Sequence, residues 1–133
     1  MELDSLEGDP VSMQIKIQWA KGELEADLKD TPTTKKLAEA LPCESKANAW
    51  GDEVYFEIPV DASLESDAQQ VVEPGTVCYW VPGRSLALPF GPTPISKGSE
   101  CRLADRCNIL GKILGDPTKL KSVKDGDMIK VLP

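Results

Sequence analysis

The sequence contains no histidine, the side chain that most often transfers protons in enzymes near neutral pH. Without it, neither a Ser-His nor a Cys-His catalytic pair can form. None of the four cysteines, Cys43, Cys78, Cys101 and Cys107, lies in a C-x-x-C pair, the spacing typical of zinc and redox sites. We therefore expect four free, mostly buried thiols, no metal and no cofactor, because an unpaired cysteine packs as a small hydrophobic residue.

The chain also lacks a long apolar run and an excess of basic residues. No segment approaches the twenty apolar residues of a membrane-spanning helix. Its 15 Lys and Arg residues are outnumbered by 22 Asp and Glu residues, which gives a net charge of −7, whereas a nucleic-acid-binding surface needs clustered basic residues. Neither nucleic acid nor a membrane is therefore an expected partner. The acidic first residues do not resemble a signal peptide, so we expect a cytoplasmic protein with a disordered leader over residues 1–11.

What the sequence does contain is a series of short segments in which apolar and polar residues alternate, the pattern of half-buried strands. The 133 residues suit a single domain, which we place at residues 12–133. Strands are predicted at residues 13–20, 23–28, 53–58, 76–81, 86–90, 107–115 and 128–132. Residues 62–70 and 97–106 are expected to be loops. Gly111, inside a predicted strand, indicates a bulge or a sharp bend.

One substantial helix is expected among these strands. Thr31 can cap its first turn and Pro32 suits its first position, while Pro42 ends it. A second, short helical turn is expected after Asp116. Because the strands follow one another without helical crossovers, antiparallel pairing is favoured. The predicted fold is mainly β: a single closed antiparallel barrel with one or two short helices.

Four blocks of the sequence form a recognisable pattern: Glu53–Phe56 (EVYF), Tyr79–Gly83 (YWVPG), Leu88–Pro94 (LPFGPTP) and Gly111–Asp116 (GKILGD). With these blocks the chain resembles a family of atypical cyclophilin-like proteins of bacteria and archaea whose function is unknown. The blocks span most of residues 13–133. The resemblance implies a closed cyclophilin-type barrel and no settled activity.

The same resemblance raises the question of prolyl isomerisation. Authentic cyclophilins use an arginine that donates to the proline nitrogen, beside phenylalanines, a glutamine, a tryptophan and a histidine. That set cannot be complete here. Arg84 lies near Trp80 and Phe90 in sequence and is the one candidate donor, although an arginine in a turn more often faces solvent. Thr93 could bind a ligand through its hydroxyl group or could satisfy the nearby backbone.

Two pairs of residues on the predicted strands have alternative interpretations. Tyr79 and Trp80 point to opposite faces, so one can lie in the core while the other lines a groove, or both can serve the core. Glu53 and Glu57 share one face of their strand, which we expect to be solvated rather than to form an acid–base pair.

The sequence thus predicts a non-catalytic binding module for a peptide or a small molecule, with Trp80, Arg84, Phe90 and Thr93 as candidate binding residues. The alternative is a weak peptidyl-prolyl isomerase with Arg84 as its candidate catalytic residue. We expect no enzymatic activity, because neither a complete cyclophilin set nor another catalytic set is present.

Overall fold

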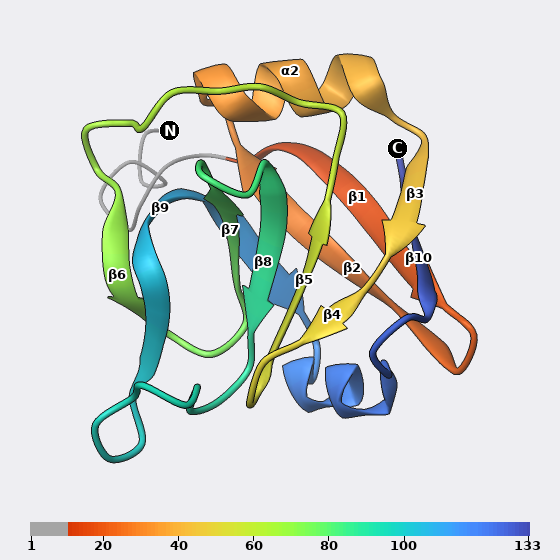
Figure 1. Ribbon diagram of the computed structural model, residues 1–133. Coiled ribbons are helices and arrows are strands. Elements are labelled where there is room, and N and C mark those ends of the chain that lie inside the picture. Colours follow the sequence, from red (N-terminus) through yellow and green to blue (C-terminus); the bar gives the residue numbers. More distant parts are fainter. Residues whose placement is uncertain (1–10) are drawn as a thin grey trace.

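A single, strongly curved antiparallel sheet forms most of the domain in the computed structural model, which describes residues 11–133 (Figure 1). Its strands are β1 (Val11–Trp19), β2 (Gly22–Lys29), β3 (Cys43–Lys46), β4 (Asn48–Ala49), β5 (Glu53–Glu57), β6 (Gln69–Val72), β7 (Thr76–Trp80), β8 (Ser85–Pro89), β9 (Cys101–Leu114) and β10 (Met128–Leu132). They are hydrogen-bonded in the order β3-β10-β1-β2-β9-β7-β8-β5-β4, and β6 pairs with β9. Every described pairing is antiparallel, which confirms the mainly β prediction.

The predicted closure of the barrel is not confirmed, because the two edge strands of the sheet, β3 and β4, do not pair with each other. They follow one another in the chain and are separated by one residue, Ala47, which leaves no room to turn back. The backbone of Ala47 instead donates to the Asp127 carbonyl and accepts from the Gly126 amide, both at 2.8 Å. The covalent chain through Ala47, rather than a ladder of hydrogen bonds, therefore connects the two edge strands β3 and β4.

Two helices lie at opposite ends of the curved sheet, α2 (Pro32–Ala40) at one end and the 3-10 helix η1 (Pro117–Ser122) at the other (Figure 1). The predicted start of α2 is confirmed. The Thr31 hydroxyl accepts from the Thr34 amide at 3.0 Å, and the Thr34 hydroxyl accepts from the Thr31 amide at 2.8 Å. This reciprocal cap satisfies two amide groups that the first turn leaves free. Within residues 11–133 neither helix is long or apolar enough to cross a membrane.

The inner face of the sheet carries the main core. The alternation of apolar and polar residues in the predicted strands points nine residues inward, and eight of them are buried there. They are Ile15, Ile17, Leu24, Val54, Phe56, Val77, Leu88 and Ile129. The ninth, Ile109, lies on the outer face, because the pairing of β7 with β9 shifts by one residue and places Leu110 inward. Gly111 follows this bulge, as predicted. A Cβ there would lie 2.0 Å from a backbone oxygen of β2, so glycine permits the close approach of the two strands.

The outer face of β5, β8 and β7 is covered by a second layer that the sequence did not predict. β9 begins at Cys101, inside the segment expected to be a loop, and β6 begins at Gln69, at the end of the other expected loop. Together they bury a second apolar cluster made of Cys78, Ala87, Leu103 and Cys107. The predicted leader falls on residues 1–10, outside the described residues, apart from Val11, which belongs to β1.

Candidate functional site

Glu53 at the start of β5 is the acidic residue whose surroundings differ most from the expected solvated face. Val54 and Phe56 enter the core, while Glu53, Tyr55 and Glu57 point to the outer face. Glu57 is exposed, as predicted, but the solvated position predicted for Glu53 is wrong, because only 6% of its surface is exposed. Leu103, Ala104 and Cys107, from the first half of β9, line one cavity together with Glu53.

A cavity of about 120 Å³ lies beside Glu53, between the outer face of the sheet and β9. Its walls are formed by Trp50, Glu53, Tyr55, Trp80, Ala87, Leu103, Ala104 and Cys107. The Tyr55 and Trp80 rings meet edge to face, with centroids 5.9 Å apart and planes 80° apart. The Trp80 indole N–H donates to a carboxylate oxygen of Asp105 at 2.9 Å. The ring contact and the hydrogen bond together fix the orientation of the Trp80 wall.

The Glu53 carboxyl group is buried without compensation. Its Oε1 atom has essentially no accessible surface and no hydrogen-bond partner among residues 11–133. Burial raises the pKa of Glu53 to about 7, because an apolar environment disfavours the ionised form. At neutral pH this group therefore exchanges readily between a neutral acid, which can donate, and a carboxylate, which only accepts.

The thiols near this cavity are chemically quiet. Burial first, and then the charges of Glu53 and Asp105, raise the pKa of Cys107 to about 12. Burial likewise raises the pKa of Cys78. Since the thiolate is the nucleophilic form, neither residue is a candidate nucleophile. All four cysteines are free in the structure, and thiol counting on freshly purified, denatured protein will test that prediction in solution.

A wider groove of about 800 Å³ adjoins the cavity, and Tyr55 and Trp80 line both. Arg84 lines this groove together with Trp80, and the sequence predicts that the two residues are neighbours. It ends a turn closed by its own amide, which donates to the Val81 carbonyl at 3.1 Å, and its φ of 50° is a left-handed conformation. The Arg84 side chain is exposed and makes no hydrogen bond or ion pair within the described part of the chain.

The other two candidate binding residues do not line this groove. Phe90 is 8% exposed and belongs to the main core. The Thr93 hydroxyl donates to the Arg102 carbonyl, and the Thr93 amide donates to the Ser96 hydroxyl at 2.8 Å. These bonds fasten the loop before β9. The structure thus brings Trp80 and Arg84 together, and places Phe90 and Thr93 elsewhere.

The structure distinguishes between the two interpretations of Tyr79 and Trp80. Tyr79 is fully buried in the main core, where its hydroxyl donates to the Val60 carbonyl at 2.6 Å. Trp80 points to the outer face and lines the cavity and the groove. The exposed aromatic surface in this region is therefore supplied by the second residue of the pair.

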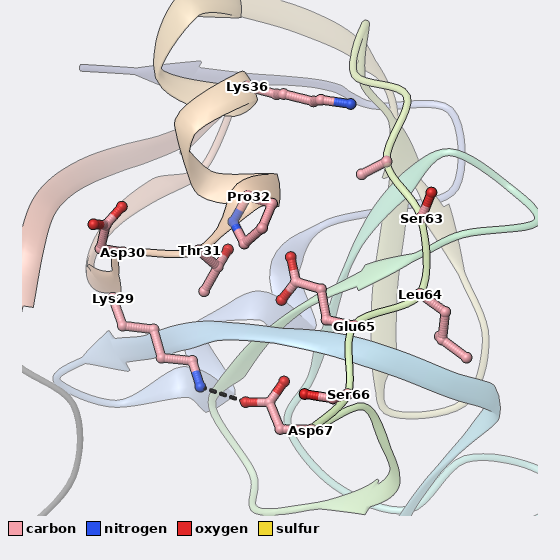
Figure 2. Close-up of a pocket in the computed structure, with 11 residues that line it drawn as sticks. Lys29, Asp30, Thr31, Pro32, Lys36, Ser63, Leu64, Glu65, Ser66 and Asp67 are labelled. Atoms are coloured by element: carbon pink, nitrogen blue, oxygen red, sulfur yellow. Dashed lines mark hydrogen bonds and ion pairs between the residues drawn. The ribbon is translucent and has the colours of Figure 1, made fainter.

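A third hollow, of about 670 Å³, lies between the start of α2 and the loop over residues 61–67 (Figure 2). Figure 2 shows Glu65 extending from this loop toward the beginning of the helix, where its carboxylate accepts from the Thr33 amide at 3.1 Å. Lys29 pairs with Asp67 at 2.7 Å, and Lys36 donates to the Asp61 carbonyl at 2.6 Å. Most charged groups of this hollow thus hold the loop to α2 and to the end of β2.

Sequence reasoning missed Glu53, Leu103 and Cys107 as members of one site. A signal for the covered outer face was present in β7 and β8. Cys78 and Ala87 are as apolar as the core residues beside them, so neither strand alternates, which is typical of a strand buried on both faces. No signal in β5 itself distinguishes Glu53 from Glu57. Within residues 11–133, no group of three or more Cys, Asp and Glu residues could hold a metal ion.

The fold and these hollows define a small, mainly β domain with one apolar, acid-containing cavity and one polar groove on its outer face. A family model described as cyclophilin-like matches residues 13–132, and the chain therefore belongs to the cyclophilin-like family. The solution structure of a hypothetical protein from Archaeoglobus fulgidus is 38% identical, with a TM-score of 0.79. The match covers 94% of this chain and 97% of that one. No curated protein matches the sequence.

Proposed function

We propose that this cyclophilin-like domain is a non-catalytic binding module, acting in the cytoplasm, whose ligand is a small molecule or a peptide side chain held against Trp80. The observation that carries the proposal is the fixed Trp80–Tyr55 pair, which lines an apolar cavity on one side and a polar groove on the other. Binding sites commonly combine apolar walls with a few oriented polar groups. Arg84 supplies such a group on the groove side.

The residues at this site favour binding over catalysis. A prolyl isomerase must hold a donor at the nitrogen of the twisted amide, and that donor must be oriented before the reaction begins. Arg84 is exposed, lies in a turn and has no partner within residues 11–133 to orient it. The chain has no histidine, and the thiol in the cavity is protonated.

The binding proposal can be tested by NMR with the tryptophan indole N–H signals as reporters. The Trp19 indole N–H donates to the Ser122 hydroxyl at 2.8 Å, far from the groove, so it serves as an internal control. We expect at least one probe, from a set of small aromatic acids, amides and amines and a proline-rich peptide, to shift Trp80 saturably at millimolar concentration and to leave Trp19 unmoved. A set in which no probe moves Trp80 selectively contradicts the proposal.

The isomerase alternative needs its own measurement. We expect the cis–trans exchange of a short X-Pro peptide, followed by exchange NMR, to proceed at its uncatalysed rate in the presence of the protein. Arg84→Ala is the informative variant and Arg106→Ala the control, because both remove an exposed arginine. Exchange accelerated by the wild type and by Arg106→Ala, but not by Arg84→Ala, would replace the binding proposal with the isomerase.

A further inference from the structure

The carboxyl group of Glu53 contains a buried oxygen atom that lacks a hydrogen-bond partner within residues 11–133. Among residues 11–133, its Oε1 atom is the buried side-chain nitrogen or oxygen without a hydrogen-bond partner. Leaving such an atom unpaired destabilises the folded state, because the atom has lost its hydrogen bonds to water and gained none in the protein. Glu53 also lines the 120 Å³ cavity. Because Oε1 itself has essentially no accessible surface, an occupant supplies the missing partner only when the carboxyl group turns toward the cavity.

When Glu53 is ionised, the missing partner of Oε1 is a hydrogen-bond donor, because a carboxylate oxygen accepts and does not donate. The cavity walls also favour a positive charge on that donor. No Lys or Arg lines the cavity, while the rings of Trp50, Tyr55 and Trp80 do. The faces of aromatic rings attract cations, and more strongly where water is excluded. Asp105, held by the Trp80 indole, adds a further negative charge beside the cavity.

The size of the cavity limits the occupant to a small group. A cavity of about 150 Å³ is known to accept a benzene molecule, and this one measures about 120 Å³. A short alkyl chain that ends in one ammonium group fits this volume, whereas a nucleotide or a folded peptide does not. The net charge of −7 favours the approach of a cation from solution.

We propose that the Glu53 cavity binds a primary alkylammonium group, with an ammonium N–H donating to Oε1 and the alkyl carbons packed against Trp80 and Leu103. The proposal rests on the proposed function, since Trp80 is a shared wall, and it names the ligand chemistry: a small amine, or a ligand whose amine enters the cavity while the remainder lies in the groove. Arg84 on the groove side then suits a ligand that carries a negative charge at its other end.

The test uses n-propylammonium chloride as the probe and titrates the full chain at pH 8, with the Trp80 indole and Leu103 amide signals as reporters. Two matched compounds separate the contributions. 1-Propanol keeps the shape and a hydrogen-bond donor but has no charge, and tetramethylammonium keeps the charge but has no N–H. We expect both to bind at least tenfold more weakly than propylammonium.

The protein variants are Glu53→Gln and Glu39→Gln, which change the net charge equally. Glu39 is exposed on α2 and lines none of the hollows described above. We expect Glu53→Gln to weaken propylammonium at least tenfold and Glu39→Gln to leave it unchanged. The comparison of the three probes on the wild type gives the same answer if Glu53→Gln does not fold.

The outcomes separate this inference from the proposed function. Propylammonium that binds no better than 1-propanol, or equally well to Glu53→Gln, overturns the inference. The binding module survives that result if any other probe moves Trp80 selectively. If no probe of any kind moves Trp80, both proposals fail.

Discussion

Glu53 and Glu65 each lie beside a hollow in the same small domain, yet their carboxyl groups have opposite surroundings. Glu65 is half-buried at the start of α2, where one carboxylate oxygen accepts from the Thr33 amide at 3.1 Å and from its hydroxyl at 2.6 Å. Glu53 is more deeply buried, and its Oε1 has no partner within residues 11–133. The Glu65 carboxylate thus takes part in the hydrogen bonds that hold the fold, whereas Oε1 of Glu53 does not.

The comparison shows that the size of a hollow is a poor guide to function in this domain. The hollow at α2 is several times larger than the Glu53 cavity, with volumes of about 670 and 120 Å³. In the larger one, most charged groups hold the loop to α2 and to the end of β2. In the smaller one, the molecule retains a desolvated acid between aromatic walls, an arrangement that costs stability and that a ligand could repay.

The largest effect on stability should come from removing the hydrogen bonds through which Asn108 connects the loop over residues 61–67 to α2. The fully buried Asn108 amide donates to the Ser63 carbonyl at 2.9 Å and to the Thr33 hydroxyl at 3.0 Å. Its oxygen accepts from the Glu65 amide at 2.7 Å. We expect Asn108→Ala to lower the free energy of unfolding by about 3 kcal/mol, and the melting temperature by roughly 10 °C.

Urea unfolding measures the first quantity and calorimetry the second. Asn48→Ala is the control, because its amide makes one exposed hydrogen bond, to the Tyr55 carbonyl at 3.3 Å. We expect that variant to change stability by less than about 0.5 kcal/mol. Similar losses for the two variants would show that the hydrogen bonds of Asn108 are not what secures the loop.

The intermediate effect concerns the unpaired acid. Between the ordinary pKa of glutamic acid, about 4.3, and the value of about 7 in the folded protein, the folded state keeps a proton that the unfolded state has lost. Stability must therefore fall as the pH rises through this window and level off above it. Burial first, and the charge of Glu53 among the further causes, raise the pKa values of the Cys78, Cys101 and Cys107 thiols, so these thiols stay neutral in this pH window.

Glu53→Gln removes this ionisation while keeping the shape of the side chain. We expect the variant to be more stable than the wild type at pH 8 by about 2 kcal/mol. The pKa difference represents roughly 4 kcal/mol, and the buried amide, with two N–H donors that lack partners, offsets about half of it. At pH 4, where the wild-type carboxyl group is neutral, the same offset should leave the variant less stable by about 1–2 kcal/mol. Chemical unfolding across pH 4–8 gives the measurement, and a variant that is less stable at pH 8 would mean that Glu53 has a partner in solution.

The contrast between the two acids was only partly predictable from the sequence. Local rules are sufficient for the start of α2 at Thr31 and Pro32 and for the bulge near Gly111, because the residues that cause them are neighbours in the chain. The alternation of apolar residues in β1, β2 and β10 likewise predicts their buried faces. The burial of Glu53 depends on β9, which lies some fifty residues further along the chain. That strand begins in a polar segment whose composition is typical of a loop.

The candidate binding residues show the same limit. The orientation of Trp80 depends on its contact with Tyr55 and on its hydrogen bond to Asp105, neither of which is adjacent in sequence. Proximity in sequence correctly associated Arg84 with Trp80, since one tight turn separates them. The same argument placed Phe90 in this group, but β8 carries the chain away from the groove and into the core before Phe90 is reached.

The smallest effect on stability should come from Glu65→Gln, which is the same exchange as Glu53→Gln. Glu65→Gln keeps an oxygen that can accept from the Thr33 amide and hydroxyl, so the cap itself can survive. It loses the negative charge beside the positive end of the α2 dipole, which is worth about 0.3–1 kcal/mol. We therefore expect a loss of about 0.5 kcal/mol at pH 8 in low salt, and a smaller loss at 1 M salt, where the charge of a half-exposed group is screened. The same exchange of Glu for Gln should thus stabilise the protein at position 53 and destabilise it at position 65. Unfolding curves of the two variants, recorded together at low and high salt, measure both signs, and a shared sign would contradict the distinction between a paired and an unpaired acid.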